Sequence, residues 1–222
     1  MNKQIVGITG LKRSGKDTSA EYLVNKYGFD CYSFAKPLKD MVAVLLNCVD
    51  CNDRYYSEAH KEEDIPGIKA SYRKLTQTLG TEWGRQLIDD NIWVNMLEAN
   101  TEYVENVVIS DVRFDNEAKW IKDNGGIIIK VTRPGLTDNA DAHVSENGIN
   151  ESYIDHHIIN NSTVEKLYLK LDDIFAKDDT LEKSWLESNL QEILDDVSLD
   201  EYNATVAVIT QLSKKLNLSL KL

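Results

Sequence analysis

A nine-residue stretch, GLKRSGKDT at positions 10–18, constrains the fold of this chain more than any other segment. It directly follows the apolar run Ile5–Thr9, which predicts a buried strand, and it opens a helical pattern from about Lys16 to Lys26. Glycines allow a backbone to curl so that its N–H groups point inward, and the first turn of a helix adds a positive dipole end. The order of strand, loop and helix therefore predicts a phosphate-binding P-loop, in which Lys16 reaches the β- and γ-phosphates of a nucleotide.

The residue after Lys16 departs from the general P-loop pattern. That pattern has Ser or Thr there, whose hydroxyl ligates Mg²⁺, whereas this chain has Asp17 followed by Thr18. Either Asp17 faces the metal or its waters, or Thr18 takes over that duty, and the sequence leaves both open. Both residues are therefore candidates for metal binding.

A second acid, Asp111, comes directly after another apolar run, Val107–Ser110. P-loop enzymes carry an acid at the end of a neighbouring strand, close enough to the metal to hold one of its waters. We therefore predict that Asp111 belongs to the site and binds the metal together with Asp17 or Thr18.

Strands alternate with helices through the first three quarters of the chain. The predicted strands lie at 5–9, 30–34, 106–110, 127–132 and around 158–159, and the predicted helices between them include 71–79 and 89–99. Such alternation is typical of a mostly parallel sheet covered by helices on both faces. The expected fold class is α/β: a P-loop NTPase with three α/β/α layers and a mostly parallel sheet of about five strands.

Composition divides the chain into a core and an appendage. Residues 1–176 form the predicted P-loop domain, with a polar insertion or mobile loop at 47–69 and a lid-like loop at 134–152. Residues 177–222 are acidic, and their apolar residues recur at helical spacing, followed by the capping-box pair Ser198 and Glu201. This segment is predicted to be a C-terminal helical hairpin.

The net charge excludes one large class of functions. Lys and Arg total 25 against 37 Asp and Glu, which gives a net charge of −12. A protein that coats polymeric nucleic acid needs a broad basic face, so no such partner is expected. No apolar run is long enough to cross a bilayer, and no signal-peptide core is present, so we expect a cytoplasmic protein without a membrane partner.

Arginines are informative in so acidic a chain, because bidentate guanidinium groups suit phosphoryl oxygens. Arg13 lies inside the P-loop. Predicted helix or strand ends are flanked by Arg73, Arg85, Arg113 and Arg133. A surface ion pair is the alternative role for each of them. The aromatic residues that could stack on a base are Trp93, Phe34 and Tyr72, although packing in the core is the commoner use of such residues.

With these residues in place, the chain resembles the deoxynucleoside monophosphate kinases of tailed phages. The matching segments run in the family's order over about residues 4–176. They are KRSGKDT at 12–18, FAKPLK at 34–39, QTLGTE at 77–82 with Gly84-Arg85 and Trp93, DVRF at 111–114 with Asn116-Glu117, and DAHVSE at 141–146. The GKDT ending is usual for this family. Together these motifs are far more specific than a P-loop alone.

The resemblance implies a nucleoside-monophosphate-kinase-like fold and a reaction in which ATP, with Mg²⁺, phosphorylates a dNMP to a dNDP. By position it puts Arg13, Gly15, Lys16, Asp17 and Thr18 on ATP, beside Gly10 and Ser14 of the same loop. It puts Lys12, Lys36, Arg73, Arg85 and Arg113 near the acceptor, where Trp93 is a further candidate. The expected catalytic residues are Lys16, Arg13, Asp111 and Arg113. The expected partners are the small molecules ATP and dNMP, the compartment is the host cytoplasm if the protein is of phage origin, and a homodimer is possible.

Two rival functions are kept beside this one. Another P-loop small-molecule kinase, such as a dephospho-coenzyme A kinase, would share the ATP site and differ in its acceptor pocket. A nucleotide-binding switch or assembly protein would bind ATP without acceptor-stimulated release of ADP. An acceptor screen separates the three functions.

Overall fold

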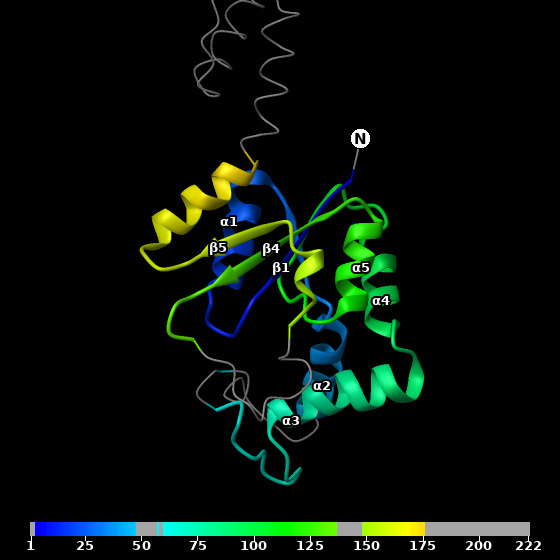
Figure 1. Cartoon of the computed structure of the whole chain (residues 1–222). Coiled ribbons are helices and arrows are strands. Elements are labelled where there is room, and N and C mark those ends of the chain that lie inside the picture. The colour runs from blue at the N-terminus through cyan, green and yellow to red at the C-terminus, as the bar shows by residue number, and fades with distance from the viewer. Residues whose placement is uncertain (1–2, 48–56, 58–59, 137–147, 176–222) are drawn as a thin grey trace, which may run out of the picture. The chain divides into compact units, whose positions relative to one another are not determined.

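The computed structural model describes residues 3–47, 57, 60–136 and 148–175 (Figure 1). The chain divides into two compact units, Met1–Tyr168 and Leu169–Leu222, and the sheet belongs to the first. The predicted C-terminal hairpin lies outside the described residues, as do residues 48–56 and 58–59 of the predicted insertion and 137–147 of the predicted lid-like loop.

The described strands form one parallel sheet in the order β2-β3-β1-β4-β5. They are β1 (Gln4–Thr9), β2 (Asp30–Tyr32), β3 (Asn106–Ile109), β4 (Ile127–Thr132) and β5 (His156–Ile159). The central strand is β1, in which Val6 pairs with Val108 of β3 on one side and with Ile127 of β4 on the other. The prediction of about five mostly parallel strands is confirmed, and every pairing in this sheet is parallel.

The strands are apolar because both faces of the sheet are covered. Ile8 of β1, Val107 of β3 and Ile129 of β4 are fully buried. Strands of parallel sheets read as continuous apolar runs when helices lie on both sides.

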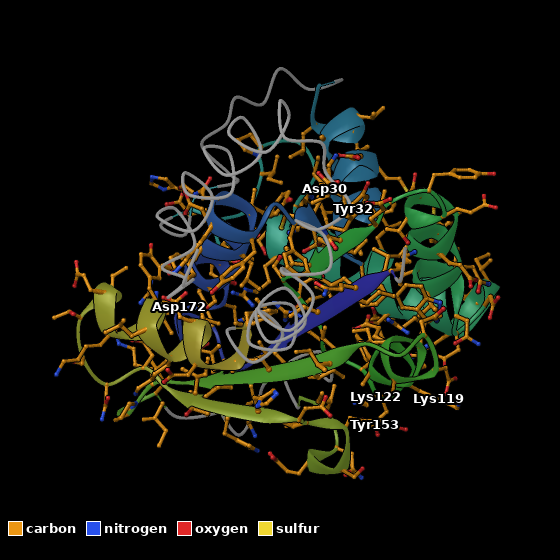
Figure 2. The ribbon with its side chains drawn as sticks, turned by 90° about the horizontal axis from the view of Figure 1, so that it is seen from above. Asp30, Tyr32, Lys119, Lys122, Tyr153 and Asp172 are labelled. Atoms are coloured by element: carbon orange, nitrogen blue, oxygen red, sulfur yellow. The ribbon has the colours of Figure 1, made fainter. Side chains whose placement is uncertain are left out.

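The sheet is accompanied by helices. The described helices are α1 (Lys16–Tyr27), α2 (Lys36–Asn47), α3 (Tyr72–Gln77), the π-helix η2 (Thr78–Ile88), α4 (Ile92–Thr101), α5 (Asp115–Asp123), the single 3₁₀ turn η4 (Glu151–Tyr153) and a helix at 164–175. Seen from above, α1 lies on one side of the sheet and α5, marked by Lys119 and Lys122, lies on the other (Figure 2). The three-layer α/β/α prediction is confirmed.

The helical region after residue 71 differs from the prediction. The sequence pattern predicts one helix that ends near residue 79 and another that starts near 89, whereas α3 continues directly into η2 as far as Ile88. Two glycines inside η2 make contacts that a larger residue would prevent. A Cβ at Gly84 would lie 2.6 Å from the ring of Trp93, whose indole N–H donates to the carbonyl of Gly80 (2.8 Å). Tertiary packing therefore sustains the helix through its glycines.

The described end of the predicted insertion packs on the core of this region. Ile65 is 1% exposed and lies with Val42 and Leu46 of α2 and Tyr72 of α3 in one apolar cluster. The backbone N–H of Ile65 also donates to the carbonyl of Ala70 (3.0 Å). Residues 60–71 therefore form a wall beside α2 and α3. Among the helices described, none is long and apolar enough to cross a membrane.

Candidate active site

The P-loop lies at the carboxyl end of the central strand β1, where ligands bind in open parallel sheets. Gly10 has φ 136°, and a Cβ there would lie 2.1 Å from the carbonyl oxygen of Val131 in β4. Gly15 has φ 112°, and its Cβ would lie 2.6 Å from Nδ2 of Asn160. Both positions therefore favour glycine, because φ is positive at each and because the β4 backbone at Gly10 and the Asn160 side chain at Gly15 approach so closely.

The loop is fixed from two directions. Asn160, directly after β5, donates from Nδ2 to the carbonyl of Ser14 (2.9 Å) and from its backbone N–H to the carbonyl of Thr132 (2.7 Å). Across the loop, Lys16 Nζ donates to the carbonyl of Leu11 (2.8 Å). The Ser14 hydroxyl is buried and has no hydrogen-bond partner among the described residues. A buried polar atom of this kind suits a site built for a polar ligand.

A cavity of about 410 Å³ opens beside the P-loop, and we call it the main cavity. Its walls come from the P-loop, the start of α2, the α3–η2 helix and the turn between β3 and α5. Eight lining residues are cationic and three are acidic, in a chain whose net charge is −12. The cations are Lys12, Arg13, Lys16, Lys39, Lys61, Arg73, Arg85 and Arg113. Such a concentration of positive charge predicts a polyanionic ligand.

Asp111 holds the start of α2 to the end of β3. Its Oδ2 accepts from the Ser33 hydroxyl (2.6 Å) and the Ala35 backbone N–H (3.0 Å), and its Oδ1 accepts from the Phe34 N–H (2.9 Å). A carboxylate has about four lone-pair sites, so three bonds leave room for one more. Asp111 therefore positions the wall that Phe34 and Ala35 contribute to the main cavity.

Two carboxylates, those of Asp17 and Asp111, belong to the lining of the main cavity. Burial raises the pKa of the Cys31 thiol, a hydrogen bond with Ser110 lowers it, and the charges of Asp111 and Asp17 raise it further. Both acids are thus close enough to act on one thiol. No cluster of three potential metal ligands occurs in the described part of the chain. A carboxylate pair beside a phosphate site nevertheless fits Mg²⁺, which is held by one or two carboxylates together with phosphate oxygens and waters.

The lining of the main cavity also includes a buried ion pair. Arg85 of η2 is 7% exposed, Glu117 of α5 is 3% exposed, and Nη2 of the arginine donates to Oε1 of the glutamate (2.5 Å). Burial raises the pKa of Glu117 to about 7, with Asp111 adding to the rise, while Arg85 and the backbone N–H groups of Arg113 and Phe114 lower it. This wall therefore carries both a fixed cation and a carboxyl group that titrates near neutrality.

A second cavity, also of about 410 Å³, lies beside the ends of β1 and β4. Its lining includes Gly10 of the P-loop, Arg133 after β4 and Glu151 of η4. Arg113 lines both cavities.

Comparison with known proteins decides the family. The family model described as deoxynucleotide monophosphate kinase matches this chain over residues 4–70 and 49–171. The chain belongs to the deoxynucleotide monophosphate kinase family. It is 35% identical over 184 residues to the "Putative deoxynucleotide monophosphate kinase" of Acanthamoeba polyphaga mimivirus, a match that covers 75% of this chain and 93% of the relative.

A phage relative agrees. The deoxynucleoside-5'-monophosphate kinase of Escherichia phage T5 is 26% identical over 223 residues, covering 70% of this chain and 89% of that protein. Among solved structures, the shikimate kinase of Aquifex aeolicus is 14% identical, with 80% of this chain and 98% of that chain covered and a TM-score of 0.49. The family predicted from the motifs is confirmed, and with it the prediction of a nucleotide monophosphate kinase, a phosphotransferase.

The main cavity gathers most of the site residues predicted for this kinase. Its lining contains Lys12, Arg13, Lys16, Asp17, Arg73, Arg85, Trp93, Asp111 and Arg113. Gly10 lines the second cavity, and neither lining includes Ser14, Gly15, Thr18 or Lys36. The ammonium group of Lys36 lies instead against Asp40 on the exposed side of α2 (2.6 Å). Lys39, about one turn further along α2, lines the cavity.

Sequence reasoning left several lining residues out of the predicted site. Lys61 comes from the predicted insertion, and Thr81 comes from a helix predicted to end earlier. Glu117 belongs to the Asn116-Glu117 pair that follows DVRF in the motif match, and this match could have singled it out. Trp93 was one of the aromatic residues that could stack on a base, with core packing as the alternative. It packs in the core: it is 2% exposed, and its indole N–H donates to the carbonyl of Gly80 in η2. Little of its ring is open to a base.

Proposed function

We propose that this kinase transfers the γ-phosphoryl group of ATP to the phosphate of a deoxynucleoside monophosphate, which yields ADP and a dNDP. The observation that carries the proposal is the main cavity, where a P-loop shares one space with Arg73, Arg85 and Arg113. A P-loop alone binds one polyphosphate. Additional arginines in the same cavity supply what a second phosphate needs.

The acceptor needs little activation. The second pKa of a phosphate monoester is about 6, so a dNMP carries nearly two negative charges near neutral pH. Its oxygen is already a nucleophile, and no strong general base is required. The work left to the protein is to hold two polyanions together and to neutralise charge on the transferred phosphoryl group.

The cations divide between donor and acceptor. We assign Arg13 and Lys16 to the phosphates of ATP, because both belong to the P-loop and line the main cavity. Arg73, Arg85 and Lys12 are assigned to the acceptor. Arg113, which lines both cavities, is assigned to the phosphoryl group in transfer.

Mg²⁺ would be held by Asp17, with Asp111 as support. Asp17 is exposed and lines the main cavity, whereas Thr18 is partly buried and lines neither cavity, so we favour Asp17 of the two. Asp111 has one acceptor site left beyond its three hydrogen bonds, which suits a bond to a metal-bound water. When bound, the ion neutralises phosphate charge during transfer.

An acceptor screen tests the proposal. ADP release from ATP is followed in a coupled assay across all dNMPs, all NMPs and dephospho-coenzyme A, and the phosphorylated product is identified by mass. We expect at least one dNMP to stimulate ADP release and to appear as its dNDP. Stimulation by dephospho-coenzyme A alone would assign a different kinase, and ATP binding without any acceptor effect would assign a nucleotide-binding switch.

Arginine variants test the division of labour. Arg113→Ala should reduce kcat, and Arg73→Ala should raise the KM for the dNMP more than the KM for ATP. Lys119→Ala is the control, because Lys119 is exposed on α5 and pairs only with Asp123 among the described acids. An equal rise in the KM for ATP and the KM for the dNMP in Arg73→Ala would contradict the assignment of Arg73 to the acceptor.

A further inference from the structure

Glu117 joins two segments of the main cavity wall that each carry an arginine. Its Oε1 accepts from Nη2 of Arg85 in η2 (2.5 Å). Its Oε2 accepts from the backbone N–H groups of Arg113 (2.8 Å) and Phe114 (3.1 Å), in the turn before α5. One carboxylate thus ties the side chain of one arginine to the backbone of the other.

The guanidinium of Arg85 is held from several sides. Its Nη1 donates to the carbonyl of Asp90 (2.8 Å) and to Oδ1 of Asn116 (3.1 Å), and the ring of Phe114 lies 4.0 Å from its central carbon. A guanidinium has five N–H groups. Three are used in these bonds, and the other two have no acceptor among the described residues. Because Arg85 lines the main cavity, these two donors are available to an anionic ligand.

A purely structural cap would not need this arrangement. A glutamate at the third position of a helix caps it by accepting backbone N–H groups, and it does so at the surface in most helices. Glu117 is 3% exposed, and burying a carboxylate is costly unless it is paired. Its Oε1 accepts a hydrogen bond from the Arg85 side chain and does not cap α5.

We propose that Glu117 is a positioning residue for the acceptor phosphate: it fixes the orientation of the Arg85 guanidinium, and its bonds to the N–H groups of Arg113 and Phe114 anchor its own carboxylate. The proposal rests on the proposed function, because that function assigns Arg85 to the acceptor. Glu117 is 3% exposed, and both of its oxygens already accept hydrogen bonds from protein groups. It acts through Arg85.

The first test compares Glu117→Gln with Asp123→Asn. Glutamine keeps the shape and one acceptor oxygen but loses the charge that holds Arg85. Asp123 lies on the same helix, is exposed, and pairs with Lys119 (2.5 Å) away from the cavity. We expect kcat/KM for the dNMP to fall about 10²-fold in Glu117→Gln, the loss typical of a misplaced binding group, with the KM for ATP unchanged. Asp123→Asn should match the wild type in both.

The second test asks whether Glu117 acts through Arg85. If it does, Arg85→Ala already removes what Glu117 contributes. The double variant Arg85→Ala/Glu117→Gln should then have the same kcat/KM for the dNMP as Arg85→Ala alone. A helix cap would instead add its own loss to that of Arg85→Ala.

The pH dependence supplies a readout that folding alone would not move. The charged groups that face Glu117 are Arg85, which favours its ionised form, and Asp111, which opposes it; Asp90 lies on the far side of the guanidinium. Because the pKa of Glu117 is raised to about 7, the carboxyl is mostly protonated below that pH, and its ionic attraction for the Arg85 guanidinium should then be lost. The KM for the dNMP should therefore rise more steeply with falling pH in the wild type than in Glu117→Gln, where only the phosphate of the dNMP still titrates.

Each outcome decides between the proposal and its failure. A folded Glu117→Gln with wild-type kcat/KM, or with equal losses toward ATP and dNMP, overturns it. If this variant does not unfold cooperatively, Glu117→Asp is measured in its place, since it keeps the charge and draws the carboxylate back by one methylene. Absence of dNMP-stimulated ADP release in the wild type and in Asp123→Asn would refute the proposed function itself, and this inference with it.

Discussion

Replacing Asp111 by alanine tests how the wall of the active site is held in place. The substitution removes three hydrogen bonds at once. It leaves the backbone N–H of Phe34 without its acceptor, while the N–H of Ala35 keeps only its bond to Oγ of Ser33 (3.2 Å). Phe34 is 2% exposed, so its N–H is poorly placed to find water instead. The change should therefore destabilise the fold as well as the site.

The magnitude follows from the bonds. A hydrogen bond to a charged group contributes about 1.5–3 kcal/mol to the free energy of unfolding. Three such bonds to one group are not additive, and water can replace part of the bonding at the half-buried position 111 after the substitution. We therefore expect a loss of about 3 kcal/mol in the free energy of unfolding. In a chain of this size each kcal/mol lowers Tm by about 2–4 °C, so Tm should fall by about 6–12 °C.

Thermal unfolding followed by circular dichroism measures this fall, and Ser33→Ala is the graded control. It removes the hydroxyl that donates to Asp111 and that also accepts from the Ala35 N–H (3.2 Å), but it leaves both backbone bonds to Asp111, so about 1 kcal/mol and about 2–4 °C are expected. An Asp111→Ala protein that melts within about 2 °C of the wild type would refute the reasoning. The role of Asp111 would then be confined to the metal, and only the Mg²⁺ requirement should change.

Four further predictions concern single positions. Lys16→Ala should lower kcat by about 10²-fold or more with an unchanged circular dichroism spectrum, since it removes charge aimed at the phosphates. Asp17→Asn should raise the Mg²⁺ concentration for half-maximal rate and leave Tm unchanged; an unshifted Mg²⁺ titration would move the metal role to Thr18. Gly10→Ala should abolish ATP binding in calorimetry, because its Cβ would lie 2.1 Å from a β4 carbonyl at φ 136°. Burial raises the pKa of Glu117 from 4.5 to about 7, so its contribution to stability is fully present below pH 4.5 and is lost as the pH rises through 7. The Tm of the wild type minus the Tm of Glu117→Gln, measured from pH 4.5 to 8, should therefore become smaller as the pH rises.

The sequence predicted those elements of the fold whose bounds are set by residues close to them along the chain. Strand β4 was predicted with its observed bounds, Ile127–Thr132, because glycines precede the run and Arg133-Pro134 ends it. The P-loop was equally readable, since its glycines, lysine and flanking elements lie within a few residues. Helix η2 was missed because its extent depends on Trp93, whose ring fills the space above Gly84.

The site shows the same division. The P-loop residues and the acid after β3 follow from position along the chain, and the structure places Lys16, Asp17 and Asp111 around one cavity. Lys36 and Lys39 could not be told apart by sequence, because the choice depends on how α2 is rotated toward the cavity. Glu117 carries no local sign of burial: a glutamate in the first turn of a helix is ordinarily exposed, and only packing against Arg85 makes it part of the wall.

The bond between Asn160 and Ser14 has a consequence for the newborn chain. The two residues are separated by 146 positions, so the P-loop leaves the ribosome long before the residue that supports it. At about 5–20 residues per second, the wait lasts roughly 7–30 s. The central strand β1 also remains unpaired for much of synthesis, because its two neighbours in the sheet, β3 and β4, are synthesised about a hundred residues later. We therefore expect that nucleotide does not stabilise a partly synthesised chain, and that the P-loop binds nucleotide only after β5 and Asn160 have been synthesised and have folded.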